Sequence, residues 1–272
     1  MIGAQMPVDR RSGLLAGRQG LVLGVANDKS IAWGIARTLH AHGAGLAFTY
    51  QGEALGKRVR ALADQVGSTM IMPADVRDDS ELDRVFSRIA DEWGRLDFLV
   101  HGIAFADRSD LVSGLTSTSR ENFLTCLDIS CFSLIDLARR AVPLMAAGGS
   151  ILTLTFQGSR NVMPNYNVMG IAKAALESTV RYLANDLGPK SIRVNAISPG
   201  PMRTLSGAAI GGARKTFRTT EANAPLRANA TLDAIGGTAV FLVSEFGSST
   251  TGEIVHVDGG YHVLGMPQPE NL

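Results

Sequence analysis

The chain has 272 residues and nearly balanced charge, with 26 basic against 25 acidic side chains. This length suffices for one large α/β domain or two small ones. The balance argues against a protein built mainly to bind nucleic acid, although a local basic patch is compatible with it. The N-terminus lacks the apolar core of a secretory signal, and no apolar run approaches the roughly 20 residues that cross a bilayer.

Apolar strand-like runs alternate with helical patterns along nearly the whole chain. Strands are predicted at 19–26, 45–50, 69–76, 96–106, 150–156, 192–200 and 252–260. Helices are predicted at 30–43, about 54–66, 80–93, a long stretch through about 146, the segment that contains Tyr166, and near 231–244. Such alternation indicates a parallel sheet covered on both faces. We predict a single α/β domain, a Rossmann-like doubly wound sheet of about seven strands, with tails at 1–15 and 263–272.

The first strand runs into the sequence "GVANDKSIAWGIA", which begins at Gly24. Ser30 is a good N-cap for the helix that follows, and Gly34 lies inside that helix, where close packing is needed. The amides of a helix N-terminus suit a pyrophosphate. The G-x-G-x-x-G fingerprint is absent, however, because Ala26 stands in place of its second glycine. An ordinary strand-to-helix turn therefore remains the alternative to a nucleotide site.

The ends of the second and third strands bear on the choice of nucleotide. Gln51 occupies the place where an acid indicates NAD and a nearby base indicates NADP, and it is neither. The residues alone therefore do not decide whether the cofactor is NAD or NADP. Asp75 and Val76 end the third strand, where a carboxylate can meet adenine; the alternative is a turn aspartate that caps a helix.

Tyr166 and Lys173 lie seven residues apart in a predicted helix. Seven steps of 100° fall about 20° short of two turns, so the two side chains share a face. A neighbouring ammonium favours the phenolate and is expected to lower the pKa of the phenol from about 10. Such a pair can deliver a proton to a developing oxyanion, although Tyr and Lys also share helical faces without any catalytic role.

Cys126 and Cys131 lie five residues apart in a predicted helix and therefore point to different faces, which makes a disulfide between them unexpected. No Cys/His cluster suggests a metal. Free thiols fit a reducing compartment, and we expect a cytoplasmic protein.

The chain resembles the short-chain dehydrogenase/reductase superfamily and, within it, the bacterial enoyl-[acyl-carrier-protein] reductases. The likeness rests on "GVANDKSIAWGIA", "LAFTYQGEALGKRV", "HGIAFA", "RNVMPNYNVMGIAKAALE", "RVNAISPGPMRTL" and "GEIVHVDGG", which span residues 19–260. The Tyr-x6-Lys spacing is its discriminating element, because most of the superfamily use Tyr-x3-Lys.

The resemblance implies reduction of a trans-2-enoyl thioester on acyl carrier protein, in fatty-acid elongation. Tyr166 is expected to stabilise the enolate oxygen, Lys173 to hold the cofactor ribose, and Ala106 to lie near the substrate. The cofactor, NADH with NADPH not excluded, is expected to meet Gly24, Ser30, Ile31, Gln51, Asp75, Val76, Ile103, Lys173, Met202, Arg203, Thr204, Leu205 and Ser206. The family is typically a homotetramer, and neither nucleic acid nor membrane is an expected partner.

Phe156 is the main departure from the family pattern, because this position is commonly a second active-site tyrosine. Either the first tyrosine is not the essential donor, as similar mycobacterial relatives with phenylalanine suggest, or the chain is a paralogue with altered or lost activity. Gly102, where serine is usual, and Asp107, where proline is usual, are expected to adjust a loop. A ketoreductase is the other alternative; the Tyr-x6-Lys spacing and the distance of Ser159 from Tyr166 speak against it.

Residues 200–227 are too long for a plain connection and are predicted to form a substrate-binding lid. Arg214, Lys215 and Arg218 lie close together in it. Because acyl carrier proteins are strongly acidic, this basic cluster is expected to steer them to the entrance. The alternative is an ordinary solvated helix face.

Overall fold

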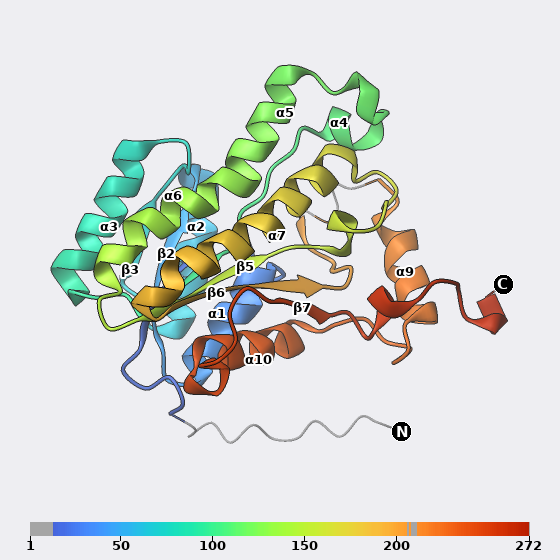
Figure 1. Ribbon diagram of the computed structural model, residues 1–272. Helices are drawn as coiled ribbons and strands as arrows, with labels where there is room; N and C mark the ends of the chain where they lie inside the picture. Colours follow the sequence, from blue (N-terminus) through green and yellow to red (C-terminus); the bar gives the residue numbers. More distant parts are fainter. Residues whose placement is uncertain (1–12, 206, 208–210, 272) are drawn as a thin grey trace.

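The structure is a computed structural model in which residues 13–205, 207 and 211–271 are described. Its centre is a seven-stranded sheet in the order β3-β2-β1-β4-β5-β6-β7, in which every pairing is parallel (Figure 1). The strands are β1 (Gln19–Leu23), β2 (Gly45–Tyr50), β3 (Met70–Pro73), β4 (Phe98–His101), β5 (Gly149–Leu154), β6 (Ile192–Pro199) and β7 (Ile254–Val257). The strand order reverses between β1 and β4, and ligands of this fold bind at the carboxyl edge beside such a reversal.

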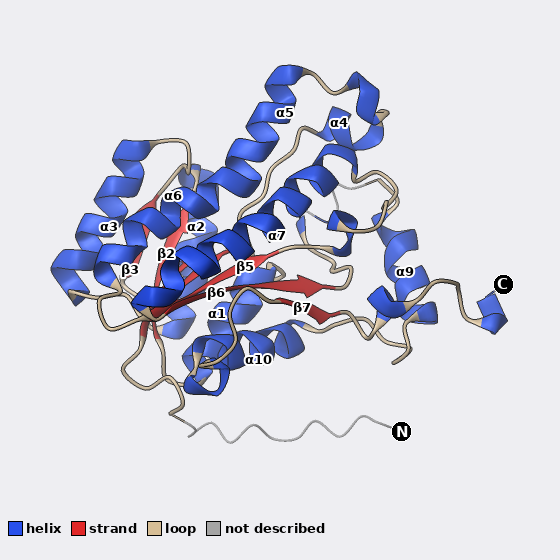
Figure 2. Ribbon diagram, in the orientation of Figure 1, coloured by secondary structure: helices blue, strands red, loops and turns tan. Residues whose placement is uncertain are grey.

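Helices cover both faces of the sheet, as the alternation of elements predicts (Figure 2). One layer contains α1 (Ile31–Ala41), α2 (Gly52–Ala63) and α10 (Leu232–Val243); the other contains α3 (Asp79–Trp93), α5 (Arg120–Leu127), α6 (Ser133–Ala141) and α7 (Asn167–Leu187). Ile35 and Ile235 are fully buried in the first layer, and Leu82 and Leu176 in the second. The central strands β1 and β4 are apolar over most of their length because they are buried on both sides, whereas the edge strand β7 is only partly buried.

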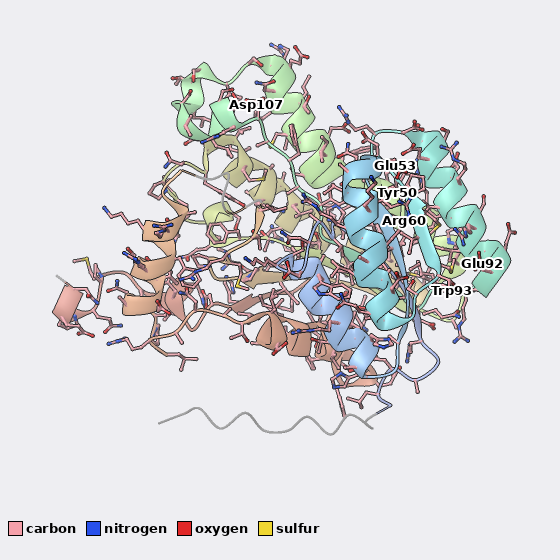
Figure 3. All side chains as sticks on the ribbon, turned by 180° about the vertical axis from the view of Figure 1, so that it is seen from behind. Tyr50, Glu53, Arg60, Glu92, Trp93 and Asp107 are labelled. Atoms are coloured by element: carbon pink, nitrogen blue, oxygen red, sulfur yellow. The ribbon has the colours of Figure 1, made fainter. Side chains whose placement is uncertain are left out.

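The region before residue 146, predicted as one long helical stretch, is divided. The short α4 (Arg108–Val112) comes first, and Asp107 caps it by accepting a hydrogen bond from the Ser109 amide at 2.8 Å (Figure 3). Ser119 caps α5, which runs into α6 through a π-helical segment, Asp128–Phe132. Asp107 thus starts a helix, because its carboxylate supplies the acceptor that the first turn needs.

The segment Ala213–Asn223 forms α9, within the predicted lid. Both predicted tails are partly packed against the domain. Leu15 is fully buried, and its amide donates to the carbonyl of His42 at 2.9 Å, so the predicted N-terminal tail extends too far. Gln268 bonds to Asn223 through its backbone amide at 2.8 Å and through its side chain at 2.9 Å, which ties the C-terminal segment to α9.

Within the described ranges, no helix is both long enough and apolar enough to span a membrane. Both cysteines are buried and free.

Candidate functional site

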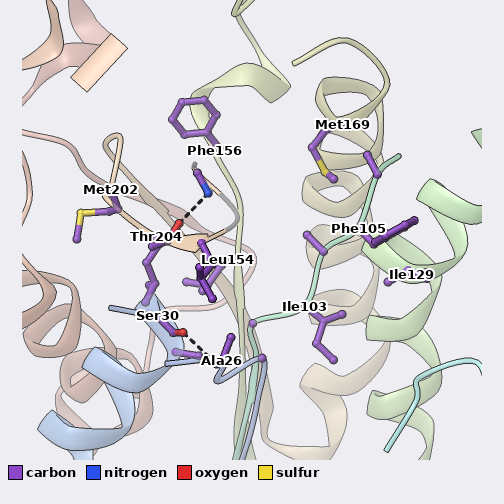
Figure 4. A pocket seen from close by; sticks show the side chains of 18 of the residues that line it. Ala26, Ser30, Ile103, Phe105, Ile129, Leu154, Phe156, Met169, Met202 and Thr204 are labelled. Carbon is purple, nitrogen blue, oxygen red and sulfur yellow. Dashed lines mark hydrogen bonds between the residues drawn. The ribbon is translucent and has the colours of Figure 1, made fainter. Parts of the chain in front are cut away.

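A cleft of about 660 Å³ opens at the carboxyl ends of the strands. It brings together most of the residues that the sequence assigned to the site: Gly24, Ser30, Ile31, Gln51, Asp75, Val76, Ile103, Ala106, Phe156, Tyr166, Lys173, Met202, Thr204 and Leu205. Arg203 does not line it, and Ser206 lies outside the described residues. Phe105, Ile129, Leu154 and Met169 give the cleft further apolar walls (Figure 4).

The loop after β1 is shaped by a glycine and a serine. Gly24 has φ +92°, and a Cβ at this position would lie 2.0 Å from the carbonyl oxygen of Gly102, so only glycine lets the two strand ends approach. Ser30 occupies the N-cap position, but its hydroxyl accepts from the amides of Ala26 and Asn27, both at 3.0 Å, and makes no cap bond to α1 (Figure 4). The prediction that the Ser30 side chain caps this helix is therefore wrong. Without it, the first amides of α1 are left for an anion.

The ends of β2 and β3 are joined by a hydrogen bond from Gln51 Nε2 to Asp75 Oδ2 at 2.8 Å. Asp75 does not cap a helix: Asp78 caps α3 by accepting from the Glu81 amide at 3.0 Å. Burial works to raise the pKa of Asp75, but hydrogen bonds from Arg77 and Gln51 outweigh it, so the pKa lies below its usual value. The carboxylate is therefore charged at neutral pH.

Tyr166 immediately precedes α7, rather than lying within it, and two asparagines fix its position. Asn165 has φ 59° and Asn167 has φ 32°, in the left-handed region that asparagine tolerates better than most residues. The side chain of Asn165 donates to the carbonyl of Gly211 at 2.7 Å, and that of Asn167 donates to the carbonyls at the end of α4. This strained turn, which sequence reasoning missed, aims the phenol; its signal is the Asn-Tyr-Asn triplet.

Gly158 leaves room for the ring of Tyr166. A Cβ there would lie 2.4 Å from Tyr166 Cδ1, so a side chain would displace the ring. Tyr166 is only 7% exposed, and no hydrogen bond joins its hydroxyl to the described part of the chain. The hydroxyl thus remains free for a ligand in the cleft.

The prediction that Lys173 lowers the pKa of the Tyr166 phenol is wrong. Burial raises the pKa of Tyr166 above its usual range, and the buried thiol and carboxyl groups nearby add to this effect. Lys173 itself is buried, which lowers the pKa of its ammonium to about 8, and its Nζ donates to the carbonyl of Leu154 at 2.8 Å. The phenol is therefore protonated at neutral pH, as a hydrogen-bond donor must be.

Phe156 packs against Tyr166, with ring centroids 5.1 Å apart and planes at 66°. This edge-on contact is a favourable arrangement of two aromatic rings. The phenylalanine therefore holds the tyrosine ring and adds apolar surface to the cleft, but offers it no hydroxyl.

The segment around Phe156 is clamped to α7 by the buried Glu177. One carboxylate oxygen of Glu177 accepts hydrogen bonds from Thr155, at 2.7 Å, and from Ser159. Arg160 lies 3.8 Å from the other carboxylate oxygen. Sequence reasoning missed this clamp, because a lone glutamate in a helix carries no pattern.

A second cavity, of about 920 Å³, adjoins the first between the β1–α1 loop and α9. Its charged lining residues in the described ranges are all basic: Lys29, Arg108, Arg203, Arg214 and Arg218. Arg203, which was expected to meet the cofactor, instead lies here with its guanidinium 4.4 Å from the ring centroid of Phe217.

In the described ranges, no group of three or more His, Cys, Asp or Glu side chains is placed to hold a metal ion. The buried His101, below the cleft, bonds through its two ring nitrogens to Thr153 and Ser133, both at 2.8 Å. Burial, aided by the charge of Lys173, lowers the pKa of His101 to about 3, so the ring is neutral. It links the end of β4 to β5 and to the helix that begins at Ser133, and it supplies no proton.

Comparisons with known proteins agree with this geometry. The family described as "Enoyl-(Acyl carrier protein) reductase" matches residues 24–262. The chain is 53% identical over 261 residues to "Enoyl-[acyl-carrier-protein] reductase [NADH] 2" of Rhizobium meliloti, covering 96% of this chain and 97% of that protein.

Two solved structures are similar throughout. The reductase of Anaplasma phagocytophilum in complex with NAD is 51% identical with a TM-score of 0.91, covering 94% of this chain and 97% of that one. The Bacillus cereus enzyme, solved with NADP+ and indole naphthyridinone, is also 51% identical with a TM-score of 0.91, covering 93% and 99%. Match length, identity and fold agree, and the chain belongs to the enoyl-(acyl carrier protein) reductase family.

Proposed function

We propose that this chain catalyses the NADH-dependent reduction of trans-2-enoyl-acyl-carrier-protein to acyl-acyl-carrier-protein, in fatty-acid elongation. The observation that carries the proposal is the hydroxyl of Tyr166, free of hydrogen bonds within the described residues, in a cleft that the buried Lys173 also lines. The relatives' names, which specify NADH, support the cofactor.

The residues of the cleft fit a dinucleotide. The close approach at Gly24 and the uncapped amides of α1 suit a pyrophosphate, and Gln51 lies where a ribose is read. Lys173, near the other end of the cleft, would hold the second ribose. When bound, NADH supplies the hydride that reaches the β-carbon of the enoyl thioester.

Tyr166 provides the electrostatic part of the reaction. Negative charge develops on the thioester oxygen as the double bond is reduced, and a fixed donor aimed at that oxygen stabilises the transition state. Because its pKa is raised, Tyr166 stays protonated and donates throughout the neutral range. Lys173 supplies a positive charge to the cleft, and the ring of Phe156 adds an apolar wall to it.

A ketoreductase remains the less favoured enzyme, because the hydroxyl of Ser159 is held by Glu177 and does not line the cleft. A non-catalytic, nucleotide-binding paralogue is the alternative from another class, and only Phe156 favours it.

Purified protein mixed with NADH and a trans-2-enoyl carrier thioester should consume NADH and yield the saturated product. Tight NADH binding without consumption at any chain length would favour the paralogue instead.

We propose that the basic side chains around the second cavity form the docking surface for the acyl carrier protein. Its cationic side chains adjoin the entrance of the cleft, and an acidic carrier would be steered to them. The cavity supports docking over the alternative of a merely solvated helix face, because Arg214 and Arg218 are joined there by cations from other segments.

Reversing the charge of Arg214, Lys215 and Arg218 to glutamate should raise KM for a carrier-bound substrate about tenfold. KM for the matching coenzyme A thioester should stay within about twofold, because that substrate lacks the acidic protein surface. Steady-state kinetics with both substrates provide the measurement. Reversing the exposed Arg181 and Lys190 is the control, and an equal rise in KM for both substrates would contradict carrier docking.

We also propose a homotetramer in the cytoplasm, with residues 200–227 as the substrate lid. Leu124, Phe132, Ile135 and Tyr182 expose apolar surface on the α5–α6 and α7 layer, which a second copy could cover. The free, buried cysteines fit a reducing compartment. Light scattering on the purified protein tests the assembly, and a monomeric mass at micromolar concentration would refute it.

A further inference from the structure

Three side chains form a hydrogen-bonded chain along one wall of the cleft. Gln51 follows β2, whereas Asp75 and Arg77 follow β3. The Gln51 amide donates to Asp75 Oδ2 at 2.8 Å, and Arg77 donates to the same oxygen through Nη2 at 3.2 Å. The backbone amide of Arg77 donates to Asp75 Oδ1 at 2.9 Å. All three residues line the cleft at the position where this fold reads the adenosine ribose.

The carboxylate of Asp75 determines how the Gln51 amide is turned. An ionised carboxylate can only accept hydrogen bonds, so the NH₂ group of Gln51 must face it. The carbonyl oxygen Oε1 then points elsewhere, and it accepts no hydrogen bond from the residues that the structure describes. The end of β2 therefore presents an unused acceptor, although Gln51 itself is neither acidic nor basic.

We propose that Asp75 is a positioning residue for cofactor selectivity: it holds Gln51 with its carbonyl oxygen outward, and this selects NADH over NADPH. A free 2′-hydroxyl can donate to Oε1. A 2′-phosphate has only acceptor oxygens at neutral pH, and it would meet both Oε1 and the negative charge of Asp75. The inference rests on the proposed use of a nicotinamide cofactor at this cleft.

Arg77 pairs with Asp75 through Nε and Nη2, so the carboxylate offsets the positive charge that would otherwise favour a 2′-phosphate. Family membership does not decide between NADH and NADPH either, since relatives of equal identity have been solved with NAD and with NADP+. The local hydrogen bonds around Gln51 supply the discrimination that the residue type alone leaves open.

The test is the ratio of dissociation constants for NADPH and NADH, measured by calorimetry on the full-length protein without substrate. Asp75→Asn should lower this ratio about tenfold, the size expected for one hydrogen bond gained or lost at a charged group. The asparagine can donate to Gln51, which lets the amide turn its NH₂ toward a phosphate, and it releases Arg77. Glu53→Gln is the matched control: Glu53 also loses one charge near β2, but its carboxylate pairs with Arg60 (Figure 3).

In a Gln51→Ala background, the effect of Asp75→Asn on the ratio should shrink at least threefold, because most of it acts through the amide. Three results would overturn the proposal: an unchanged ratio, an equal effect with and without Gln51, or an equal effect of Glu53→Gln.

If Asp75→Asn fails to fold, Gln51→Ala alone decides the question. It should weaken NADH binding about fivefold and leave NADPH binding within twofold, and equal weakening of both would refute the inference. A protein that shows these ratios but reduces no enoyl thioester would refute the proposed function and leave the inference standing. Failure to bind either cofactor would refute both.

Discussion

Tyr166→Phe is expected to lower kcat by a factor on the order of 10²–10³ while leaving the dissociation constant for NADH within about threefold. The substitution removes one oxygen that makes no hydrogen bond within the described chain, so its main effect falls on the transition state. Stopped-flow reduction of an enoyl thioester, together with NADH titration, measures both quantities.

The matched control is Tyr182→Phe, because Tyr182 lies on α7 and is 74% exposed. Its kcat should be unchanged. The thermal stability of Tyr166→Phe should also be close to that of the wild type, since the ring and its contact with Phe156 are retained. An unchanged kcat for Tyr166→Phe would remove the phenol from the reaction.

Lys173→Met is expected to abolish most activity and, at pH 7, to stabilise the fold by about 2 kcal/mol. The ammonium would otherwise hold the cofactor ribose, so NADH affinity should fall with kcat. Stability should rise because burial lowers the pKa of Lys173 to about 8, which means that keeping the charge in the folded protein is costly. Loss of the hydrogen bond to Leu154 offsets part of the gain.

The size of this stabilisation depends on pH. The folded state binds the Lys173 proton less tightly than the unfolded state, so the cost is fully present below about pH 8. It disappears as the pH rises toward the usual lysine value. Denaturant unfolding from pH 7 to 10 should therefore show the advantage of Lys173→Met shrinking above pH 8, whereas the exposed control Lys190→Met should show none; a destabilised Lys173→Met at pH 7 would contradict this account.

The sheet and most of the cleft could be predicted from the sequence, because apolar periodicity and turn residues are local signals. Positions such as Gly24 and Gln51 then follow from the topology, since strand ends of one parallel sheet share an edge. The resemblance to the family supplied the roles expected of Tyr166 and Lys173, which their spacing on a helix face left open.

The remaining features depend on three-dimensional packing and have no sequence pattern. The raised pKa of Tyr166 arises from burial, which a helix-face argument does not include. The bond from Ser30 to the preceding loop amides competes with the expected cap, and only the loop geometry decides between them. The Glu177 clamp joins two segments far apart in the chain.

These features also bear on Phe156. Its ring packs on Tyr166, and Glu177 holds its neighbours Thr155 and Ser159, so the segment is built around a phenylalanine. The position need not supply a hydroxyl, because Tyr166 retains one that makes no hydrogen bond with the described residues. This favours a working reductase over a paralogue that has lost its activity.

The most direct test of the central claim is a single-turnover reaction of the wild-type protein, with NADH dideuterated at C4 of the nicotinamide and a trans-2-enoyl carrier thioester in ordinary water. Mass spectrometry of the product should show one deuterium, located on the β-carbon, with the α-carbon proton taken from solvent. A complex that binds both reactants and forms no saturated product, or a product with deuterium on the α-carbon, would contradict the account.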